Sequence, residues 1–275
     1  MAIRMEIEVV SNLPLLSQMI RRDIKGRYIG SAMGIFWSVI NPLIMIAIYV
    51  LVFSSLMQEK WKFGDVETVY AVYLCSALLP WLWFQEAMIT SCNSVVFNGS
   101  LLKRTAFPSA ILPLSAVLSS GVHFLIAMGL FVIITVLLGA FPGVWILGLF
   151  PVIIIQVLLL LGPAYLLATL NVFIRDTQQI IVALLTFLFW ATPIVYPVSL
   201  VTGDRVPDGM KKTILSAWYQ FNPALHLSNL YRSVLIGRSM PRIKSVAYLL
   251  AVAAVLYVAG KWLFTRSRHH FVDEL

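Results

Sequence analysis

The chain has 275 residues, of which 60% are hydrophobic and only 12% are charged, and its net charge is +8. Soluble domains carry roughly 25% charged residues, so this composition excludes an ordinary soluble domain and indicates an all-α integral membrane protein. The positive charge does not indicate a nucleic-acid partner, because the basic residues stand at the ends of apolar segments, where they anchor a chain to membrane lipids. The only cysteines, Cys75 and Cys92, have no metal-ligand spacing, so no metal site is expected.

An amphipathic helix is predicted at residues 12–29, lying in the membrane interface. Its apolar stripe consists of Leu13, Leu16, Ile20 and Ile24. The same segment carries a basic cluster formed by Arg21, Arg22, Lys25 and Arg27. Guanidinium forks suit a pyrophosphate head group at the membrane surface. The alternative is that the cluster only orients the chain and binds anionic lipids.

Six apolar segments are long enough to cross a membrane as helices, which requires about 20 mostly apolar residues each. They are residues 31–57, 69–93, 109–138, 144–170, 180–200 and 243–264. A proline inside the first segment, Pro42, predicts a kink. The connections are expected to be a short polar loop at 58–68, a polar connector at 94–108, a tight turn at 140–143 and a tail at 265–275.

Residues 201–242 are too polar, and too often broken by glycine and proline, to span a membrane. Asn222 followed by Pro223 is typical of a helix N-cap with proline at the first helical position, and Gly237 is typical of a helix end. We therefore expect two short helices, at 208–220 and 223–236, forming re-entrant or periplasmic helices at an outer gate.

An even number of spans places both termini on the same side of the membrane. The segments on that side carry far more Lys and Arg than the first loop and the 140–143 turn, although 201–242 places further basic residues on the opposite side. Because positive residues are enriched in cytoplasmic loops, we expect both termini in the cytoplasm.

Four short patterns follow one another along the chain. They are Arg22 to Lys25 with Arg27, Tyr28, Gly34, Trp37 and Pro42; Asn98 to Pro108; Leu170 and Asn171 with Arg175 and Asp176; and Phe271, Asp273 and Leu275. In this order they resemble the ABC-2 type polysaccharide export permeases, a family that includes O-antigen, capsule and teichoic-acid exporters. The resemblance covers nearly the whole chain.

This resemblance implies a homodimeric permease of the bacterial cytoplasmic membrane that works with two copies of a separate ABC ATPase subunit. It also implies export of a glycan linked to a polyprenyl pyrophosphate, typically undecaprenyl pyrophosphate. The chain has no G-x-x-x-x-G-K-S/T phosphate loop, so ATP and Mg would be held by the partner. This chain is therefore expected to be a transport subunit without a cofactor, not an enzyme.

The resemblance also suggests roles for three sets of residues. Residues of the 94–108 connector would couple the permease to the ATPase: Asn98, Leu101, Lys103, Arg104 and Phe107. A cytoplasmic gate would contain Asn171, Arg175 and Asp176. Rings that could stack on sugars in a channel are Trp37, Tyr49, Phe53, Trp81, Trp83, Phe84, Phe187 and Trp190. Each set also has an alternative interpretation. The connector would be an ordinary basic loop, the gate residues would form a surface ion pair that contributes little to stability, and the aromatic rings would form interfacial belts or pack in the core.

Glu86 is a carboxylate well inside a predicted span, and such residues are functional candidates by default. His123, in the third span, is expected to be a packing residue. Two other functions stay open: an ABC-2 exporter of a drug or small lipid, and an ion-coupled secondary transporter. A single buried carboxylate without a partner or an inverted repeat disfavours the second of these.

Overall fold

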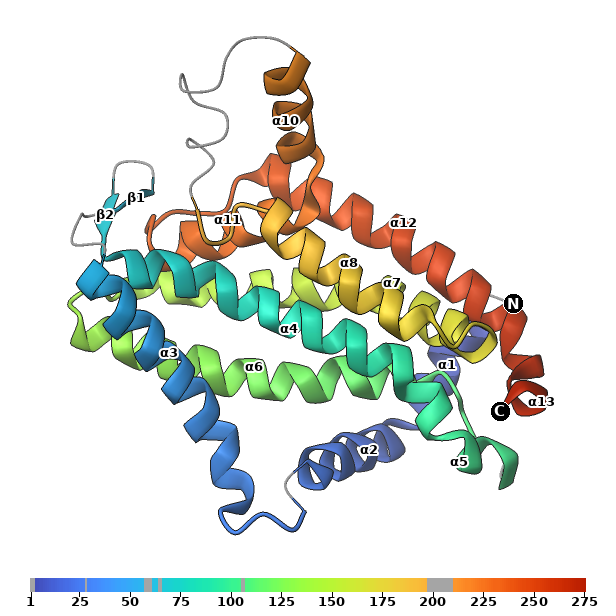
Figure 1. The fold of residues 1–275 in the computed structure, drawn as a ribbon. Coiled ribbons are helices and arrows are strands. Elements are labelled where there is room, and N and C mark those ends of the chain that lie inside the picture. Colours follow the sequence, from blue (N-terminus) through green and yellow to red (C-terminus); the bar gives the residue numbers. More distant parts are fainter. Residues whose placement is uncertain (1–2, 28, 57–60, 64–65, 105–106, 197–209) are drawn as a thin grey trace.

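The computed structural model describes residues 3–27, 29–56, 61–63, 66–104, 107–196 and 210–275. Long helices run side by side in one bundle, while α2 lies along its edge and α10 projects from it (Figure 1). The main elements are α1 (Ile3–Ser11), α2 (Leu13–Gly26), α3 (Trp37–Leu56), β1 (Trp61–Phe63), β2 (Val66–Thr68), α4 (Tyr70–Phe97), α5 (Gly99–Arg104), α6 (Ile111–Leu137), α7 (Leu149–Phe173), α8 (Thr177–Ala191), α10 (Met210–Phe221), α11 (Pro223–Leu235), α12 (Ile243–Ser267) and α13 (Phe271–Glu274).

Within the described residues, four helices are long and apolar enough to cross a membrane: α4, α6, α7 and α12. Two shorter apolar helices accompany them, one within α3 and the other α8. Each of the six predicted spans overlaps one of these six helices, of which four have the length and hydropathy of a span, so the count of six stays a prediction. However, α8 ends at Ala191, well before the predicted end at residue 200, and residues 197–200 lie outside the described part of the chain.

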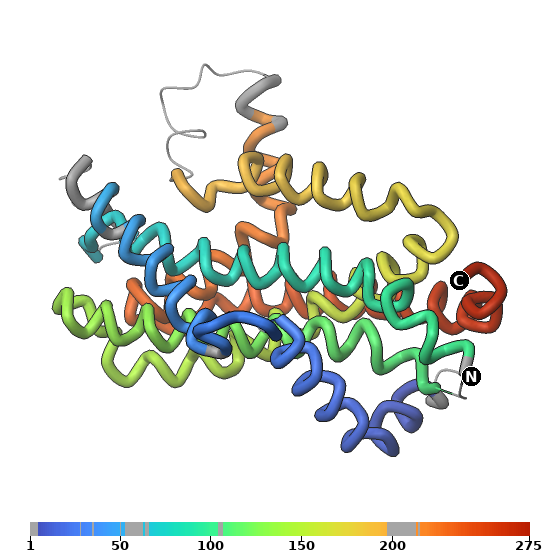
Figure 2. The backbone as a smooth tube through the Cα atoms, turned by 60° about the horizontal axis from the view of Figure 1, so that its bottom comes forward, coloured from blue at the N-terminus to red at the C-terminus, as the bar shows by residue number. Residues whose placement is uncertain are grey.

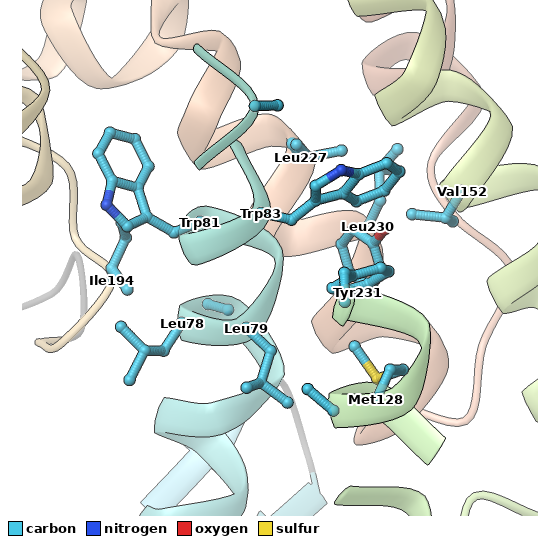
Figure 3. Packing of buried hydrophobic residues seen from close by; sticks show 14 of the residues in the cluster. Leu78, Leu79, Trp81, Trp83, Met128, Val152, Ile194, Leu227, Leu230 and Tyr231 are labelled. Atoms are coloured by element: carbon cyan, nitrogen blue, oxygen red, sulfur yellow. The ribbon is translucent and has the colours of Figure 1, made fainter. Parts of the chain in front are cut away.

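Helix α4 is the centre of the main core, because α6, α7, α11, α3 and α8 all contact it. Figure 3 shows Trp81 and Trp83 leaving α4 on opposite sides, so the helix is buried on more than one face. The Trp83 ring stacks on Phe124 with centroids 4.7 Å apart, and its indole N–H donates to the Val117 carbonyl at 3.3 Å. Gly121 leaves room for that ring, since a Cβ there would lie 3.0 Å from it.

Helices α7 and α12 pack along their length and touch backbone to backbone. A Cβ on Gly162 would overlap the main chain of Leu256, and a Cβ on Gly260 would overlap the carbonyl of Gly162. Small residues at a contact point let helices in a membrane approach closely, which increases their van der Waals contact. The two glycines therefore set the distance between α7 and α12.

A second apolar cluster joins the two ends of the described chain. It contains Met5, Leu16, Phe264 and Phe271 and also draws on the ends of α4 and α7. Lys261 is paired with Glu6, and Arg268 donates to Glu8 at 2.8 Å, so α1 is tied to α12. Burial would raise the pKa of Glu6, but the hydrogen bond from Lys261 holds it below its ordinary value. Both termini thus lie at the same end of the bundle (Figures 1 and 2).

Three segments differ from the sequence-based expectation. The 58–68 stretch, expected to be a polar loop, contains the antiparallel pair β1 and β2, in which Phe63 faces Val66. Residues 3–11 form a helix that was not predicted, and the 265–275 tail is largely helical. The tail folds back because Phe271 is buried against Phe264. These differences arise from tertiary contacts that a local pattern does not contain.

The turn that follows α8 is held by side chains from other elements. Arg232 donates to the carbonyls of Pro193, at 3.3 Å, and Ile194, at 2.7 Å. Tyr70 donates to the Val195 carbonyl at 2.6 Å. The guanidinium of Arg232, which is 1% exposed, also lies 3.8 Å from the ring centroid of Tyr73. This network fixes residues 193–195 between α4 and α11.

The predicted cap of α11 is confirmed. The Asn222 side chain accepts hydrogen bonds from the backbone N–H groups of Ala224, at 2.9 Å, and Leu225, at 3.3 Å. Its amide also donates to the Thr192 hydroxyl at 2.9 Å, which adds a further attachment for the turn after α8. Pro223 fits the first helical position because no hydrogen bond is needed there.

We expect Asn222→Ala to lower the free energy of unfolding by about 1–2 kcal/mol, because it removes a buried cap. Asn222→Asp keeps the accepting oxygen and should retain part of that energy. The measurement is thermal or denaturant unfolding of the purified protein in detergent. Asn229→Ala, in the same helix, is the control; an equal loss in both alanine variants would contradict a specific capping role.

Candidate functional site

A cavity of about 420 Å³ with a mixed polar and apolar lining, here called the interfacial cavity, lies between α2, α4, α6 and the start of α8. Arg22 and Arg27 line it from the side of α2, and Asn93 and Asn98 line it from α4. Arg22 donates to the Asn98 side chain at 2.6 Å. The structure thus brings together residues that the sequence assigned to two different roles, head-group binding and ATPase coupling.

Helix α2 presents its cations to the cavity because of its amphipathic pattern. Leu16 and Met19 are buried in the second apolar cluster, where they dock α2 against the bundle. Leu13, which was predicted to be part of the apolar stripe, is exposed. All four basic residues predicted as a cluster are exposed, but Arg22 and Arg27 line the cavity, whereas Arg21 and Lys25 are not among its lining residues.

Arg27 is the best anchored of these cations. It is paired with Glu86 of α4, and it also lies 3.4 Å from the Asp23 carboxylate one turn earlier. Burial would lower the pKa of Arg27, but the charges and hydrogen bonds of Glu86 and Asp23 raise it above its ordinary value. Arg27 therefore stays cationic, and both a second cation, Arg22, and the Asp23 carboxylate line the same cavity. Two guanidinium groups with amides beside them can bind a phosphate or pyrophosphate group.

A smaller cavity of about 260 Å³, here called the inner cavity, lies between α3, α4 and α6. Its polar lining includes Ser38, Asn41, Glu86 and His123. The His123 Nδ1 atom lies 3.9 Å from the Glu86 carboxylate. Arg27 lines this cavity as well as the interfacial one.

The predicted coupling residues lie on and beside α5. Leu101 and Phe107 are half-buried and pack against the second apolar cluster, while Lys103 is exposed. The Arg104 side chain lies outside the described residues. A Cβ on Gly99, at the start of α5, would lie 3.4 Å from the side chain of Leu275. The connector therefore contacts the tail at the end of the bundle where the termini meet.

The predicted gate residues have different environments. Asn171 is buried and donates to the Cys92 carbonyl at 3.0 Å and to the Asn93 side chain at 3.2 Å, so it ties α7 to α4. Arg175 and Asp176 are exposed at the junction of α7 and α8. A role for these residues in gating stays a prediction.

The predicted channel aromatics also separate into groups. Trp81 and Trp83 are buried, and Trp37, Tyr49 and Phe84 are half-buried. Phe187 and Trp190, both on α8, are 63% exposed. The Phe53 side chain lies outside the described residues. Trp81 and Phe84 also line a largely apolar cavity of about 440 Å³ that Trp218 closes from α10.

Sequence reasoning did not single out Ser38, Asn41, Asn93 or Arg232. The first three are ordinary polar residues within apolar segments, so a helical wheel of each segment was the only available signal. Arg232 was counted among the basic residues of a loop region, whereas in the structure it is one of the largest fully buried side chains. Its position in an amphipathic helix rich in leucine was the available signal.

A bundle of long apolar helices beside a short amphipathic helix is the architecture of a multi-pass membrane protein. Residues 14–236 match the family model for the ABC-2 type transporter. The chain belongs to the ABC-2 type transporter family, as its sequence patterns predicted.

Three relatives share this chain's full length. It is 30% identical to the O-antigen export system permease protein RfbA of Myxococcus xanthus, over 99% of this chain and 100% of that protein. Two proteins of the same name from Klebsiella pneumoniae are 28% and 26% identical, each over 100% of both chains.

Proposed function

We propose that this chain is the permease subunit of an ATP-driven exporter that moves a polysaccharide linked to undecaprenyl pyrophosphate out across the bacterial cytoplasmic membrane. The single observation that carries the proposal is the interfacial cavity, where Arg22 and Arg27 offer two guanidinium groups to an anionic head group. Family membership and the printed names of the relatives support a glycan as cargo. The exported glycan would be O-antigen-like, which places the protein in lipopolysaccharide biosynthesis.

In this proposal α3, α4, α6, α7, α8 and α12 are six spans, and both termini lie in the cytoplasm. Two copies of the chain form the channel. The exposed rings of Phe187 and Trp190 on α8 support this arrangement, because a second copy would cover them or a glycan would slide along them. The α10 and α11 helices shape the outer exit.

Energy comes from two copies of an ABC ATPase that bind ATP and Mg. The exposed Lys103 on the short α5 helix, together with α13 beside it, supports docking at this end of the bundle. A movement of the docked ATPase can reach the spans only through a rigid connection. Helix α5 provides one, because it follows directly after the long, buried α4. Movement of the ATPase would therefore reach α4 and the interfacial cavity that it lines.

A second candidate function is export of a drug or a small lipid. It is favoured by the largely apolar cavity of about 440 Å³ between α4, α7, α10 and α11. An acyl chain or an apolar ring system fits such a lining better than a sugar does.

The test is affinity purification of the tagged protein from its native membranes, followed by ATPase measurements in lipid nanodiscs. We expect a nucleotide-binding partner in equal amount, with activity stimulated several-fold by an undecaprenyl-pyrophosphate-linked glycan. Arg22→Ala with Arg27→Ala should remove that stimulation, because both cations line the interfacial cavity. The matched control is Arg21→Ala with Lys25→Ala, which removes two exposed cations from the same helix.

A protein that purifies alone would contradict the ATPase-driven mechanism. Stimulation by hydrophobic drugs but not by the lipid-linked glycan would favour the second candidate. An equal loss of ATPase stimulation in both double variants would show that only the total positive charge of α2 matters.

A further inference from the structure

The interfacial and inner cavities meet at one ion pair. Arg27 is the residue that lines both, and its guanidinium is paired with Glu86, which lines the inner cavity. Arg27 comes from the end of α2, whereas Glu86 comes from the middle of α4. A ligand that draws Arg27 toward the interfacial cavity would therefore open a route into the inner one.

The inner cavity has the chemistry of a small sugar site. Glu86 supplies an acceptor, the Asn41 amide both donates and accepts, and the Ser38 hydroxyl does the same. Trp37 and Trp83 add two indole rings to the lining. The negative face of an aromatic ring attracts the weakly positive C–H groups of a sugar, while the polar side chains match its hydroxyls.

The size of the cavity restricts the ligand further. Its volume of about 260 Å³ lies just below the roughly 300–1,000 Å³ typical of pockets that hold drug-sized molecules. A single ring fits this space better than a chain of sugars. Trp83 gives it a rigid wall, because its ring is stacked on Phe124 and its N–H is already bonded to Val117.

Glu86 needs a partner in either state. A carboxylate inside a membrane protein is costly unless it is paired, and Arg27 now supplies the pairing charge. If a pyrophosphate takes over the Arg27 guanidinium, Glu86 needs donors besides His123, whose Nδ1 atom lies 3.9 Å from its carboxylate. The hydroxyl groups of a sugar attached to the pyrophosphate can donate hydrogen bonds to the Glu86 carboxylate in the inner cavity.

We propose that the inner cavity binds the first sugar attached to the polyprenyl pyrophosphate, with Glu86 and Asn41 as its hydrogen-bonding residues. This inference rests on the proposed function and adds a second element of recognition to it. Recognition of the head group would then have two parts, since Arg22 and Arg27 bind the phosphates and the inner cavity binds the sugar. In the absence of the lipid, the Glu86 carboxylate pairs with Arg27 in place of the pyrophosphate.

The test compares two probes on the intact complex in nanodiscs: undecaprenyl pyrophosphate and undecaprenyl-pyrophosphoryl N-acetylglucosamine. The unmodified protein should bind the sugar-bearing lipid at least tenfold more tightly. Glu86→Gln and Asn41→Ala should each reduce this ratio below about threefold. The affinity of Glu86→Gln for the lipid without sugar should be higher than that of the unmodified protein, because Glu86 no longer competes for Arg27.

Two variants make the outcome decisive. Asn41 is exposed, so its replacement should leave the fold intact even if Glu86→Gln lowers the yield. Asn229→Ala removes the same amide from a different cavity, formed by α11 and the start of α12, and should keep the tenfold ratio. Equal binding of both probes by the unmodified protein, or a tenfold ratio that survives in both inner-cavity variants, would overturn the inference alone. Failure to bind either lipid would overturn the proposed function as well.

Discussion

Gly162→Ala and Gly260→Ala are each expected to destabilise the folded protein severely, although each adds a single methyl group. In both cases the new Cβ would overlap backbone atoms of the facing helix, not the end of a movable side chain. No rotamer change relieves such a clash, so α7 and α12 must separate along their shared length. Overpacking in a core typically costs 1–3 kcal/mol, and we expect a cost above about 3 kcal/mol here.

The measurement is the folded fraction by size-exclusion chromatography in detergent, together with the temperature of half-unfolding. Gly129→Ala in α6 is the matched control, because nothing lies within 4 Å of a Cβ at that position. Alanine is the better helix former, so this control should be neutral or stabilising by up to about 1 kcal/mol. Similar yields for all three variants would falsify the close approach of α7 and α12.

Arg232→Met is expected to lower the free energy of unfolding by about 3 kcal/mol. The change leaves the buried carbonyls of Pro193 and Ile194 without their donor, at about 1–3 kcal/mol for each unsatisfied group. It also removes the cation from the ring of Tyr73. Relief from the cost of burying a charge offsets part of this loss.

Arg232→Lys distinguishes charge from geometry. A lysine keeps the positive charge but not the planar fork that reaches two carbonyls at once, so it should recover less than half of the loss. Arg242→Met, which replaces an exposed arginine at the start of α12, is the control and should change stability by less than about 0.5 kcal/mol. If Arg232→Met were as stable as that control, the turn after α8 would not depend on Arg232.

Local chemistry made part of the fold predictable. The order of apolar segments, the amphipathic helix α2 and the cap of α11 all follow from patterns within a few residues, and the structure contains each of them. Element ends were less predictable, because α8 stops at Ala191 while its apolar composition continues beyond that point. Hydropathy reflects the free energy of transferring side chains from water into a membrane, and it does not indicate where a helix ends.

Tertiary pairs were not predictable from one sequence. Arg27 and Glu86 were each identified as candidates, but they are 59 residues apart and nothing in either segment indicates that they meet. Gly162 and Gly260 are single glycines in apolar helices, without a repeated small-residue motif. Arg232 is similar, because its partners are backbone carbonyls, which have no signature in the sequence. The candidate site was therefore predicted as separate parts, and only the fold joins them.

The second apolar cluster also constrains the order in which the molecule can be made. Met5 and Leu16 are synthesised well before Phe264 and Phe271, which join them in one cluster. At about 5–20 residues per second, roughly 10–50 seconds pass between these events. The helices of the main core can pack meanwhile. The end of the bundle that our proposal assigns to the ATPase thus cannot form until α12 and α13 have been made, so a partner that recognises it selects permeases in which these helices have already packed against α1 and α2.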